Sequence, residues 1–305
     1  MDEVIRTDGL TKHYGRVRAA DDISLSVKKG EVYGFLGLNG AGKTTTIRML
    51  LGMINPTAGS AFLYDKKVNA GSYHLWENVG YLVEIPYSYP DLTVRENLEM
   101  VRRLRGIPDR KSVDVVMEKL RLIPYENRKA KDLSQGNAQR LGLAKALIHN
   151  PGILILDEPS NGLDPVGIVE MREMFRDLAL NHGVTIFISS HILGEISRLA
   201  TRIGIIHSGR MVQEINTEEL KHLLRKRLIV DARDQKAAQA MLTKEGYAVG
   251  VSREGALEIM DENAISSPDA IATLMVKAGL PPTLLKIDEE DLESFFLRAV
   301  DAGGA

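Results

Sequence analysis

A glycine-rich segment in the first fifty residues constrains the fold more than any other feature of the sequence. It reads Gly-Leu-Asn-Gly-Ala-Gly-Lys-Thr from Gly37 to Thr44, after an apolar run at 32–37 and before a helical pattern at 44–53. Glycines let successive backbone N–H groups curl around an anion, and the following helix directs its positive end at the same point. The pattern predicts a phosphate-binding loop, and a chance glycine-rich turn is the alternative.

The side chains of this loop have distinct expected roles. The Lys43 ammonium is expected to reach the β- and γ-phosphates of a nucleotide, and the Thr44 hydroxyl to ligate Mg²⁺. The other residues that we expect to contact the nucleotide are Asn39, Gly40, Ala41, Gly42 and Thr45.

Short apolar runs recur along the chain, with helical patterns between them. After the run at 32–37 they occupy 79–84, 153–158, 184–190 and 202–209. Strands that are separated by helices need crossover connections, which predicts an α/β fold with a mostly parallel sheet. The segment 94–149 carries no good strand pattern, and we interpret it as a helical insert.

Two carboxylates end the apolar run at 153–158. Ligand chemistry gathers at the carboxyl ends of parallel strands. We therefore expect Asp157 to hold Mg²⁺ through its water shell and Glu158 to polarise an attacking water. A buried strand that ends in a solvated turn is the alternative, which the phosphate loop makes less favoured.

Composition excludes several classes of protein. The chain has 305 residues, 44 % hydrophobic and 26 % charged, which is typical of a globular protein and not of a disordered, collagen-like or coiled-coil chain. A net charge of −2 argues against a nucleic-acid partner. There is no cysteine for a thiolate metal site or nucleophile. We expect neither a membrane span, which needs about 18 apolar residues in a row, nor a signal peptide.

The pattern of the chain changes near residue 221. A basic stretch leads into a strand pattern at 227–232, and the elements that follow are a helix at 236–246, a hairpin at 247–260, a helix at 266–280, a strand at 283–288 and a last helix at 289–302. The order β-α-β-β-α-β predicts a ferredoxin-like domain with an added terminal helix.

Residues 1–220 closely resemble an ATP-binding cassette (ABC) ATPase. Leu-Ser-Gln-Gly-Asn at 133–137 is similar to the family signature, usually LSGGQ, and residues 160–164 resemble the loop that follows the acidic pair. His191 resembles the switch histidine, and Tyr14 the aromatic residue that stacks on adenine. A structural histidine at a strand end and simple packing of the tyrosine are the alternatives.

The resemblance implies a nucleotide site that two subunits share. Ser134, Gly136 and Asn137 would contact the ATP held by the other subunit, either a second copy of this chain or a paralogous cassette. Independently of the resemblance, the helical pattern after Ser134 lets this residue present donors at a helix N-terminus, and a plain helix cap is the alternative. Separate transmembrane permease subunits and the cofactors ATP and Mg²⁺ are further implications.

Glu84 departs from the family pattern, which has glutamine at this position. Glutamate can ligate a hard cation, but it also adds negative charge near the γ-phosphate. Cassettes of bacitracin- and lantibiotic-type exporters tend to carry glutamate here, followed by proline and aromatic residues, as in this sequence. We expect Glu84 to contact Mg²⁺ and to tune the coupling of hydrolysis to transport.

The sequence therefore predicts a P-loop NTPase cassette at 1–220, with an antiparallel β part and a helical subdomain at about 85–149, and an α+β domain at 221–305. Its expected function is the cytosolic ATP-hydrolysing subunit of an exporter of a drug, antibiotic or peptide, peripheral on the inner face of the membrane. The residues expected to be catalytic are Lys43, Glu84, Glu158 and His191. An importer, a lipid or polysaccharide exporter and, less favoured, a ribosome- or DNA-associated ABC ATPase are the alternatives.

Overall fold

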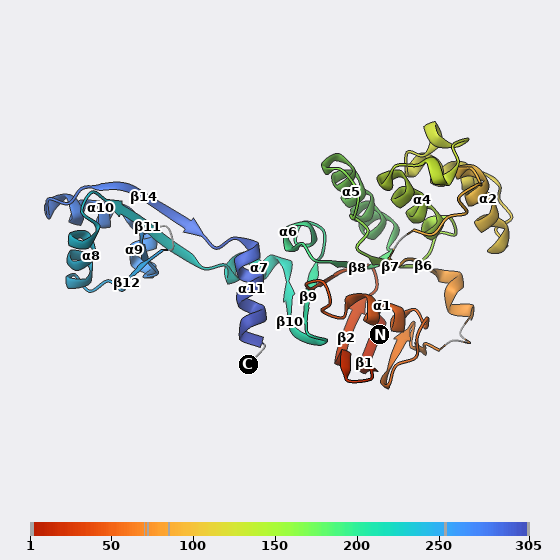
Figure 1. Cartoon of the computed structure of the whole chain (residues 1–305), viewed down its shortest axis with the longest axis horizontal. Coiled ribbons are helices and arrows are strands. Elements are labelled where there is room, and N and C mark those ends of the chain that lie inside the picture. Colours follow the sequence, from red (N-terminus) through yellow and green to blue (C-terminus); the bar gives the residue numbers. More distant parts are fainter. Residues whose placement is uncertain (1–2, 70, 72, 85, 253–254, 304–305) are drawn as a thin grey trace. The chain divides into compact units, whose positions relative to one another are not determined.

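The computed structural model describes residues 3–69, 71, 73–84, 86–252 and 255–303. The chain divides into two compact units, residues 1–218 with 299–305 and residues 219–298 (Figure 1). We propose that they are separate domains, as the change of pattern near residue 221 indicated. The segment 299–305, which the sequence analysis assigned to the second domain, groups with the larger unit.

A six-stranded sheet forms the centre of the larger unit, in the order β10-β9-β3-β8-β7-β6. The strands are β3 (Val32–Leu36), β6 (Val79–Leu82), β7 (Ile153–Asp157), β8 (Thr185–Ser190), β9 (Arg202–His207) and β10 (Arg210–Asn216). All neighbours pair in parallel except β10, which runs antiparallel to β9. Every residue of β3 and β7 is buried, which explains their unbroken apolar runs. The predicted α/β fold with a mostly parallel sheet is confirmed.

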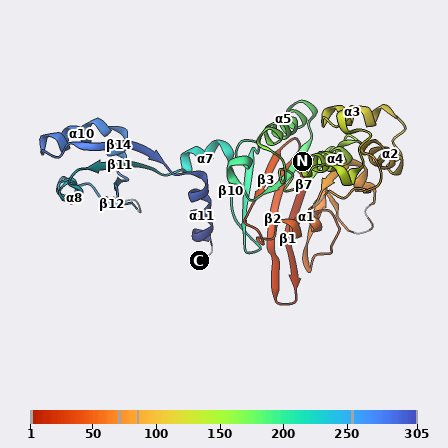
Figure 2. The same ribbon diagram turned by 45° about the horizontal axis from the view of Figure 1, so that its top comes forward.

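A second sheet of the larger unit is antiparallel, in the order β2-β1-β4-β5 (Figure 2). Its strands are β1 (Glu3–Tyr14), β2 (Val17–Lys28), β4 (Ala58–Leu63) and β5 (Lys66–Lys67). Ile5, Leu10 and Ile23 of this sheet share one hydrophobic cluster with Phe35 of β3 and Ile47. The two sheets therefore enclose a common core, and the antiparallel part expected of the cassette is present.

Helices cover both sides of the central sheet. They are α1 (Lys43–Leu50), α5 (Pro165–His182), α6 (Leu193–Ile196) and the short 3₁₀ helix η1 (Tyr73–Asn78). The helix α7 (Thr217–Leu223) follows β10 and contains the boundary between the two units. Figure 1 shows α5 on one side of the sheet, and α1 with the antiparallel sheet on the other.

Residues 86–149, here called the helical part, lie on the same side as α5 (Figure 1). Their helices are α2 (Val94–Leu104), α3 (Lys111–Lys119), α4 (Gln135–Leu147) and the 3₁₀ turns η2 (Ile123–Tyr125) and η3 (Ala130–Asp132). Thr93 and Glu96 form a capping box at the start of α2. Among the described residues of this part no strand occurs, only an isolated bridge between Thr93 and Lys129, so the predicted helical insert is confirmed.

The smaller unit is built around a four-stranded antiparallel sheet in the order β12-β13-β11-β14. Its elements are β11 (Lys226–Ala232), α8 (Gln235–Lys244), β12 (Val249–Val251), β13 (Leu257–Ile259), α9 (Glu262–Ser266), α10 (Pro268–Lys277), β14 (Pro282–Glu289) and the first part of α11 (Leu292–Gly303), whose residues from 299 on group with the larger unit. This order is the ferredoxin-like one that the sequence predicts, with α9 and α10 in the place of its second helix. Residues 253–254, in the predicted hairpin, lie outside the described residues.

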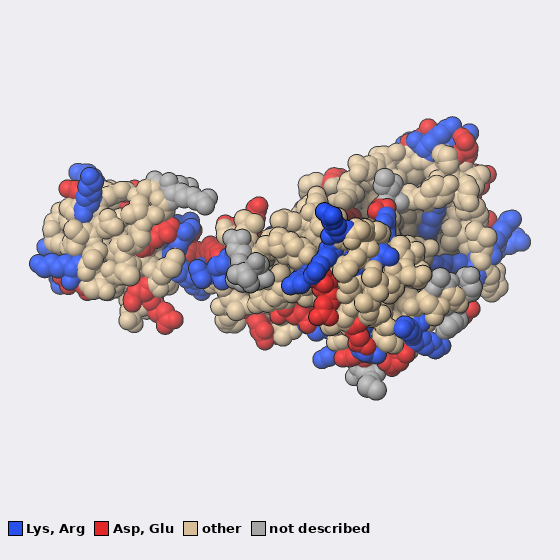
Figure 3. All heavy atoms as spheres, turned by 60° about the horizontal axis from the view of Figure 1, so that its bottom comes forward, with Lys and Arg blue, Asp and Glu red and all other residues tan. Residues whose placement is uncertain are grey.

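Two further observations concern membrane-spanning helices and the distribution of surface charge. In the part of the chain that the structure describes, no helix is long and apolar enough to cross a membrane. Basic and acidic side chains are interspersed over the face of the molecule in Figure 3.

The imidazole of His149, just after α4, is a buried polar group with an incomplete set of partners. Its Nε2 lies 3.1 Å from the carbonyl oxygen of Val79 in β6, so this nitrogen carries the proton of the neutral ring. Its Nδ1 is buried without a hydrogen-bond partner among the described residues. Burial, aided by the nearby charge of Arg105, lowers the pKa of His149 from 6.5 to about 4. The fold therefore favours the neutral imidazole.

We expect the free energy of unfolding to decrease as the pH falls from 6.5 towards 4. In that range the unfolded chain binds a proton at residue 149 that the folded chain excludes, so this residue contributes a slope of at most about 1.4 kcal/mol per pH unit. Urea denaturation at several pH values measures it. His149→Gln should flatten this part of the profile, whereas His13→Gln, at an exposed histidine of β1, should not. If the free energy of unfolding depends on pH equally in the original chain and both variants, His149 is not the group responsible.

Candidate functional site

The glycine-rich loop lies between β3 and α1, as the sequence predicts. Gly42 immediately precedes the helix and has a left-handed backbone, with φ of 109°. A Cβ at this position would lie 2.3 Å from the carbonyl oxygen of Ala19, so only glycine fits. The backbone N–H of Ala41, one of the expected nucleotide contacts, donates to the carbonyl of Leu38 at 3.0 Å.

A surface hollow of about 400 Å³ opens above the loop. We call it the phosphate hollow, and it is lined by Val17, Arg18, Ala19, Asn39, Gly40, Gly42, Lys43, Thr44, Thr45, Glu158, Asn161 and Ser208. Apart from Ala41, the residues expected to contact the nucleotide within the loop all line this one hollow.

The Lys43 side chain is buried at the base of the phosphate hollow, with 6 % of its surface exposed. Its ammonium donates to the carbonyls of Gly37 at 2.6 Å and Leu38 at 3.3 Å, and it lies 3.1 Å from Oε1 of Glu158. A buried ammonium needs such partners because desolvation is costly. A phosphate in the hollow would compete with Glu158 for this cation.

Thr44 and Asp157 meet through a hydrogen bond between α1 and the end of β7. The Thr44 hydroxyl donates to Oδ2 of Asp157 at 2.7 Å. The hydroxyl of Ser189, in β8, donates to the other oxygen, Oδ1, at 2.6 Å. The same Ser189 oxygen accepts the backbone N–H of Glu158 at 3.0 Å. Both carboxylate oxygens of Asp157 are thereby fixed in place.

Glu158 follows Asp157 with a left-handed backbone, at φ of 49°. While its Oε1 faces Lys43, its Oε2 lies 2.7 Å from Nδ1 of His191, just after β8. The carboxylate therefore joins two side chains that the sequence analysis placed at the reaction centre. This arrangement can hold a base at the mouth of the phosphate loop.

The donor set at Thr44 and Asp157 suits a hard cation. A hydroxyl and a carboxylate are the oxygen ligands that Mg²⁺ prefers, usually together with water and substrate phosphates. Among the described residues, no three histidine, aspartate or glutamate side chains converge on one point that could hold a metal. Mg²⁺ bound here would depend on nucleotide oxygens as well.

The signature residues line a different hollow of about 680 Å³, which we call the signature hollow. Ser134 caps α4, where its hydroxyl accepts the N–H of Asn137 at 3.3 Å. Gly136 and Asn137 line the hollow with Ser134, and so do Gly162 and Asp164 from the loop after the acidic pair. No residue lines both this hollow and the phosphate hollow. The two groups of predicted nucleotide contacts therefore lie in separate hollows of the same chain.

Tyr14 and Glu84 lie outside both hollows. The Tyr14 ring at the end of β1 is 49 % exposed, with the Lys12 ammonium 5.2 Å from its centre. Glu84 has φ of 57°, and its Oε1 lies 2.5 Å from a guanidinium nitrogen of Arg48 in α1. The structure therefore pairs Glu84 with a cation and not with Thr44 or Asp157, the other two expected metal ligands.

Two polar residues of the site were given no role of their own in the sequence analysis, although Asn161 lies in the loop 160–164 that the resemblance singled out. Ser189 orients Asp157, and Asn161 lines the phosphate hollow. The signal for Ser189 was its place two residues before the switch histidine, at the end of a strand that was predicted to belong to the parallel sheet. A serine in a buried strand carries no signal of its own direction, because the sheet register decides which group it meets.

Known proteins resemble this chain over the cassette and beyond it. A sequence profile described as ABC transporter matches residues 20–161. Bacitracin transport ATP-binding protein BcrA of Bacillus licheniformis is 39 % identical over 305 residues, covering 99 % of each chain. Lantibiotic transport ATP-binding protein SrtF of Streptococcus pyogenes is 34 % identical, over 75 % of this chain and 100 % of that one.

Solved structures share the fold of the larger unit. "Structure of ATP binding subunit of ABC transporter" has a TM-score of 0.66 and 26 % identity, over 72 % of this chain and 92 % of that chain. "Dimeric Structure of MJ0796, a Bacterial ABC Transporter Cassette" has a TM-score of 0.65 and 25 % identity, over 70 % and 98 %.

We expect Glu158→Gln to lower the rate of Mg²⁺-ATP hydrolysis by at least about a hundredfold, because an amide cannot accept the proton of water. Binding of a fluorescent ATP analogue should remain. Full turnover in Glu158→Gln would exclude it as the base.

Ser189→Ala should slow hydrolysis by about tenfold, since Asp157 loses one hydrogen bond that orients it. Ser197→Ala, at a half-buried serine just after α6 and outside the site, is the control.

Proposed function

The chain belongs to the family of ABC transporter ATP-binding proteins, and on this premise we propose that it powers export of a bacitracin- or lantibiotic-type antibiotic through separate membrane subunits. It binds and hydrolyses ATP as a subunit of an ABC transporter. The export proposal rests on the extent of the similarity to BcrA. That similarity spans 99 % of this chain and includes the smaller unit, which lies beyond the cassette.

We propose that hydrolysis proceeds at the phosphate hollow. The Lys43 ammonium and the backbone N–H groups at the start of α1 bind the β- and γ-phosphates. Glu158 accepts a proton from the attacking water, and His191 holds the Glu158 carboxylate and donates to the γ-phosphate in turn. Thr44 and Asp157 would hold Mg²⁺, which offsets charge on the phosphates.

The separation of the two hollows supports a site shared between two copies of the chain. Ser134 and Gly136 lie at the N-terminus of α4, where free N–H groups can bind a phosphate, yet the loop of the same chain lines another hollow. In a two-fold dimer each chain can present its signature hollow to the phosphate hollow of its partner. The MJ0796 cassette, similar in fold, is described as dimeric.

A groove of about 510 Å³ offers a surface for the membrane subunits. It is lined by Arg48, Met53, Tyr81, Leu82, Val83, Glu84, Pro86, Tyr87, Val101, Leu104, Arg105, Gly142, Lys145 and Ala146. Tyr87 and Leu104 are 74 % and 78 % exposed. Large apolar side chains left in water are typical of a binding surface. We propose that this groove receives a cytoplasmic segment of the permease, which holds the chain at the inner face of the membrane.

Lys145 of α4 links the groove to the rest of the helical part. Its ammonium donates to the carbonyl of Tyr87, the hydroxyl of Ser88 and Oδ1 of Asn97, at 3.0, 2.9 and 3.2 Å. Burial lowers the pKa of Lys145 to about 8. Since the signature residue Ser134 caps the N-terminus of α4, this contact supports coupling between the groove and the shared nucleotide site.

We expect the rate of ATP hydrolysis per chain to rise with protein concentration, because the active species is a dimer. Ser134→Arg should abolish hydrolysis at every concentration, since the larger side chain blocks the partner's phosphates, while ATP still binds at the chain's own loop. Ser266→Arg in the smaller unit is the control. Unchanged hydrolysis by Ser134→Arg would contradict a shared site but not ATPase activity.

We expect Glu84→Gln to change the rate of hydrolysis and its dependence on Mg²⁺ concentration, because it removes a charge that can ligate the cation. Arg48→Gln breaks the same ion pair but keeps the carboxylate. Comparing the two variants separates the effect of losing the Glu84 carboxylate from the effect of losing its ion pair with Arg48. If both titrate with Mg²⁺ like the original chain, Glu84 has no part in metal binding.

A further inference from the structure

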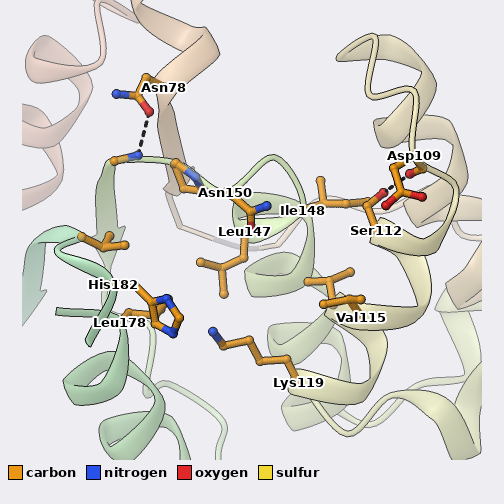
Figure 4. A pocket seen from close by; sticks show the side chains of 14 residues that line it. Asn78, Asp109, Ser112, Val115, Lys119, Leu147, Ile148, Asn150, Leu178 and His182 are labelled. Atoms are coloured by element: carbon orange, nitrogen blue, oxygen red, sulfur yellow. Dashed lines mark hydrogen bonds between the residues drawn. The ribbon is translucent and has the colours of Figure 1, made fainter. Parts of the chain in front are cut away.

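A third hollow, of about 540 Å³, lies on the larger unit away from the residues assigned to nucleotide and permease (Figure 4). One wall comes from the helical part, through α3 and α4. The other comes from α5 and from the segment 150–152 that leads into β7. None of its lining residues lines the phosphate hollow, the signature hollow or the groove. We call it the helix hollow.

The floor of the helix hollow is apolar. Leu147 of α4, Val116 of α3 and Leu178 of α5 are each less than 9 % exposed, and Val184 lies among them before β8. The volume falls in the range of small-molecule sites, which are mostly apolar with a few polar groups that orient the ligand. An apolar group of a ligand placed here would leave water at little cost.

The Lys119 side chain lies at one end of this apolar floor. Figure 4 shows the Lys119 side chain reaching from α3 across the hollow towards His182 of α5. Within the described ranges, the Lys119 ammonium makes no hydrogen bond or ion pair with another side chain. The other basic side chain at this end, His182, has its Nε2 3.5 Å from a carboxylate oxygen of Asp177. Asp177 is close enough to act electrostatically on Lys119 as well, but it makes no ion pair with it, so the ammonium can still pair with an anion.

The other end of the hollow is polar, and none of the described residues that line it there is basic. Figure 4 shows Asp109 and Ser112 at the far side from Lys119. Asp109 accepts the N–H of Lys111 at 2.9 Å, and the Ser112 hydroxyl donates to the Asp109 carbonyl at 2.7 Å. The Asp109 carboxylate would repel a second negative group on the same ligand. The charges therefore favour a ligand with one anionic end.

We propose that the helix hollow binds a small amphipathic monocarboxylate, with its carboxylate at Lys119 and its apolar body over Leu147 and Leu178. This site is separate from the ATP and permease surfaces and does not depend on the proposed cargo. An occupant contacts α4 on one side and α5 on the other. It therefore ties the helical part, which carries the signature residues, to the central sheet.

Calorimetric titration of the purified full-length chain with decanoate, kept below its micelle concentration, tests the proposal. We expect saturable binding of one decanoate per chain. Decyltrimethylammonium has the same chain length and the opposite charge, and it should bind at least about tenfold more weakly, because it meets Lys119 with like charge.

Three variants locate the binding. Lys119→Met keeps an apolar stem without the charge and should weaken decanoate binding by about tenfold. Lys111→Met makes the same change at an exposed lysine of α3 that does not line the hollow, and it should bind like the original chain. Val115→Trp, at a side chain that is 62 % exposed, should fill the mouth and abolish binding without unfolding the chain.

Circular dichroism of each variant confirms that it is folded before it is titrated. No saturable binding of decanoate to the original chain would overturn the proposal. Equal affinities of Lys119→Met and Lys111→Met, or binding retained in Val115→Trp, would also overturn it, because the ligand would then lie elsewhere. Equal binding of decanoate and decyltrimethylammonium would overturn the role of Lys119.

Discussion

The site is organised around the Glu158 carboxylate, which lies between the Lys43 ammonium and the His191 imidazole. It joins the loop after β3 to the ends of β7 and β8, and the pairing of Asp157 with Ser189 on neighbouring parallel strands sets its position. Parallel strands bring their carboxyl ends to one edge. Charged groups can be buried there because each one meets a partner.

A second set of contacts fixes the helical part to this sheet. Glu170 of α5 pairs with Arg121 and Arg140, and the Gln139 amide donates to the carbonyl of Pro159 at 3.0 Å. Arg140 and Gln139 belong to α4, whose first turn carries the signature residues. The signature hollow is thus positioned relative to the acidic strand of its own chain, although it lines no part of that chain's phosphate hollow.

The sequence predicted the elements that have a strong period or a fully buried run. The five parallel strands of the central sheet, the helical part and the ferredoxin-like order of the smaller unit all fall in this class. The long strands β1 and β2 received no ranges, because they bury residues irregularly and contain register shifts that break an alternating pattern. Their place was implied only by the resemblance to a cassette.

Within the site, the sequence by itself determined which residues could bind phosphate, because glycine, lysine and threonine at fixed spacing form a loop whatever surrounds them. It also determined the acidic pair and the helix cap at Ser134. Only the tertiary structure decided which side chains meet. It placed Ser189 on Asp157 through strand register, and it paired Glu84 with Arg48 of α1. Such contacts join residues far apart in the chain, so no local pattern of residues could specify them.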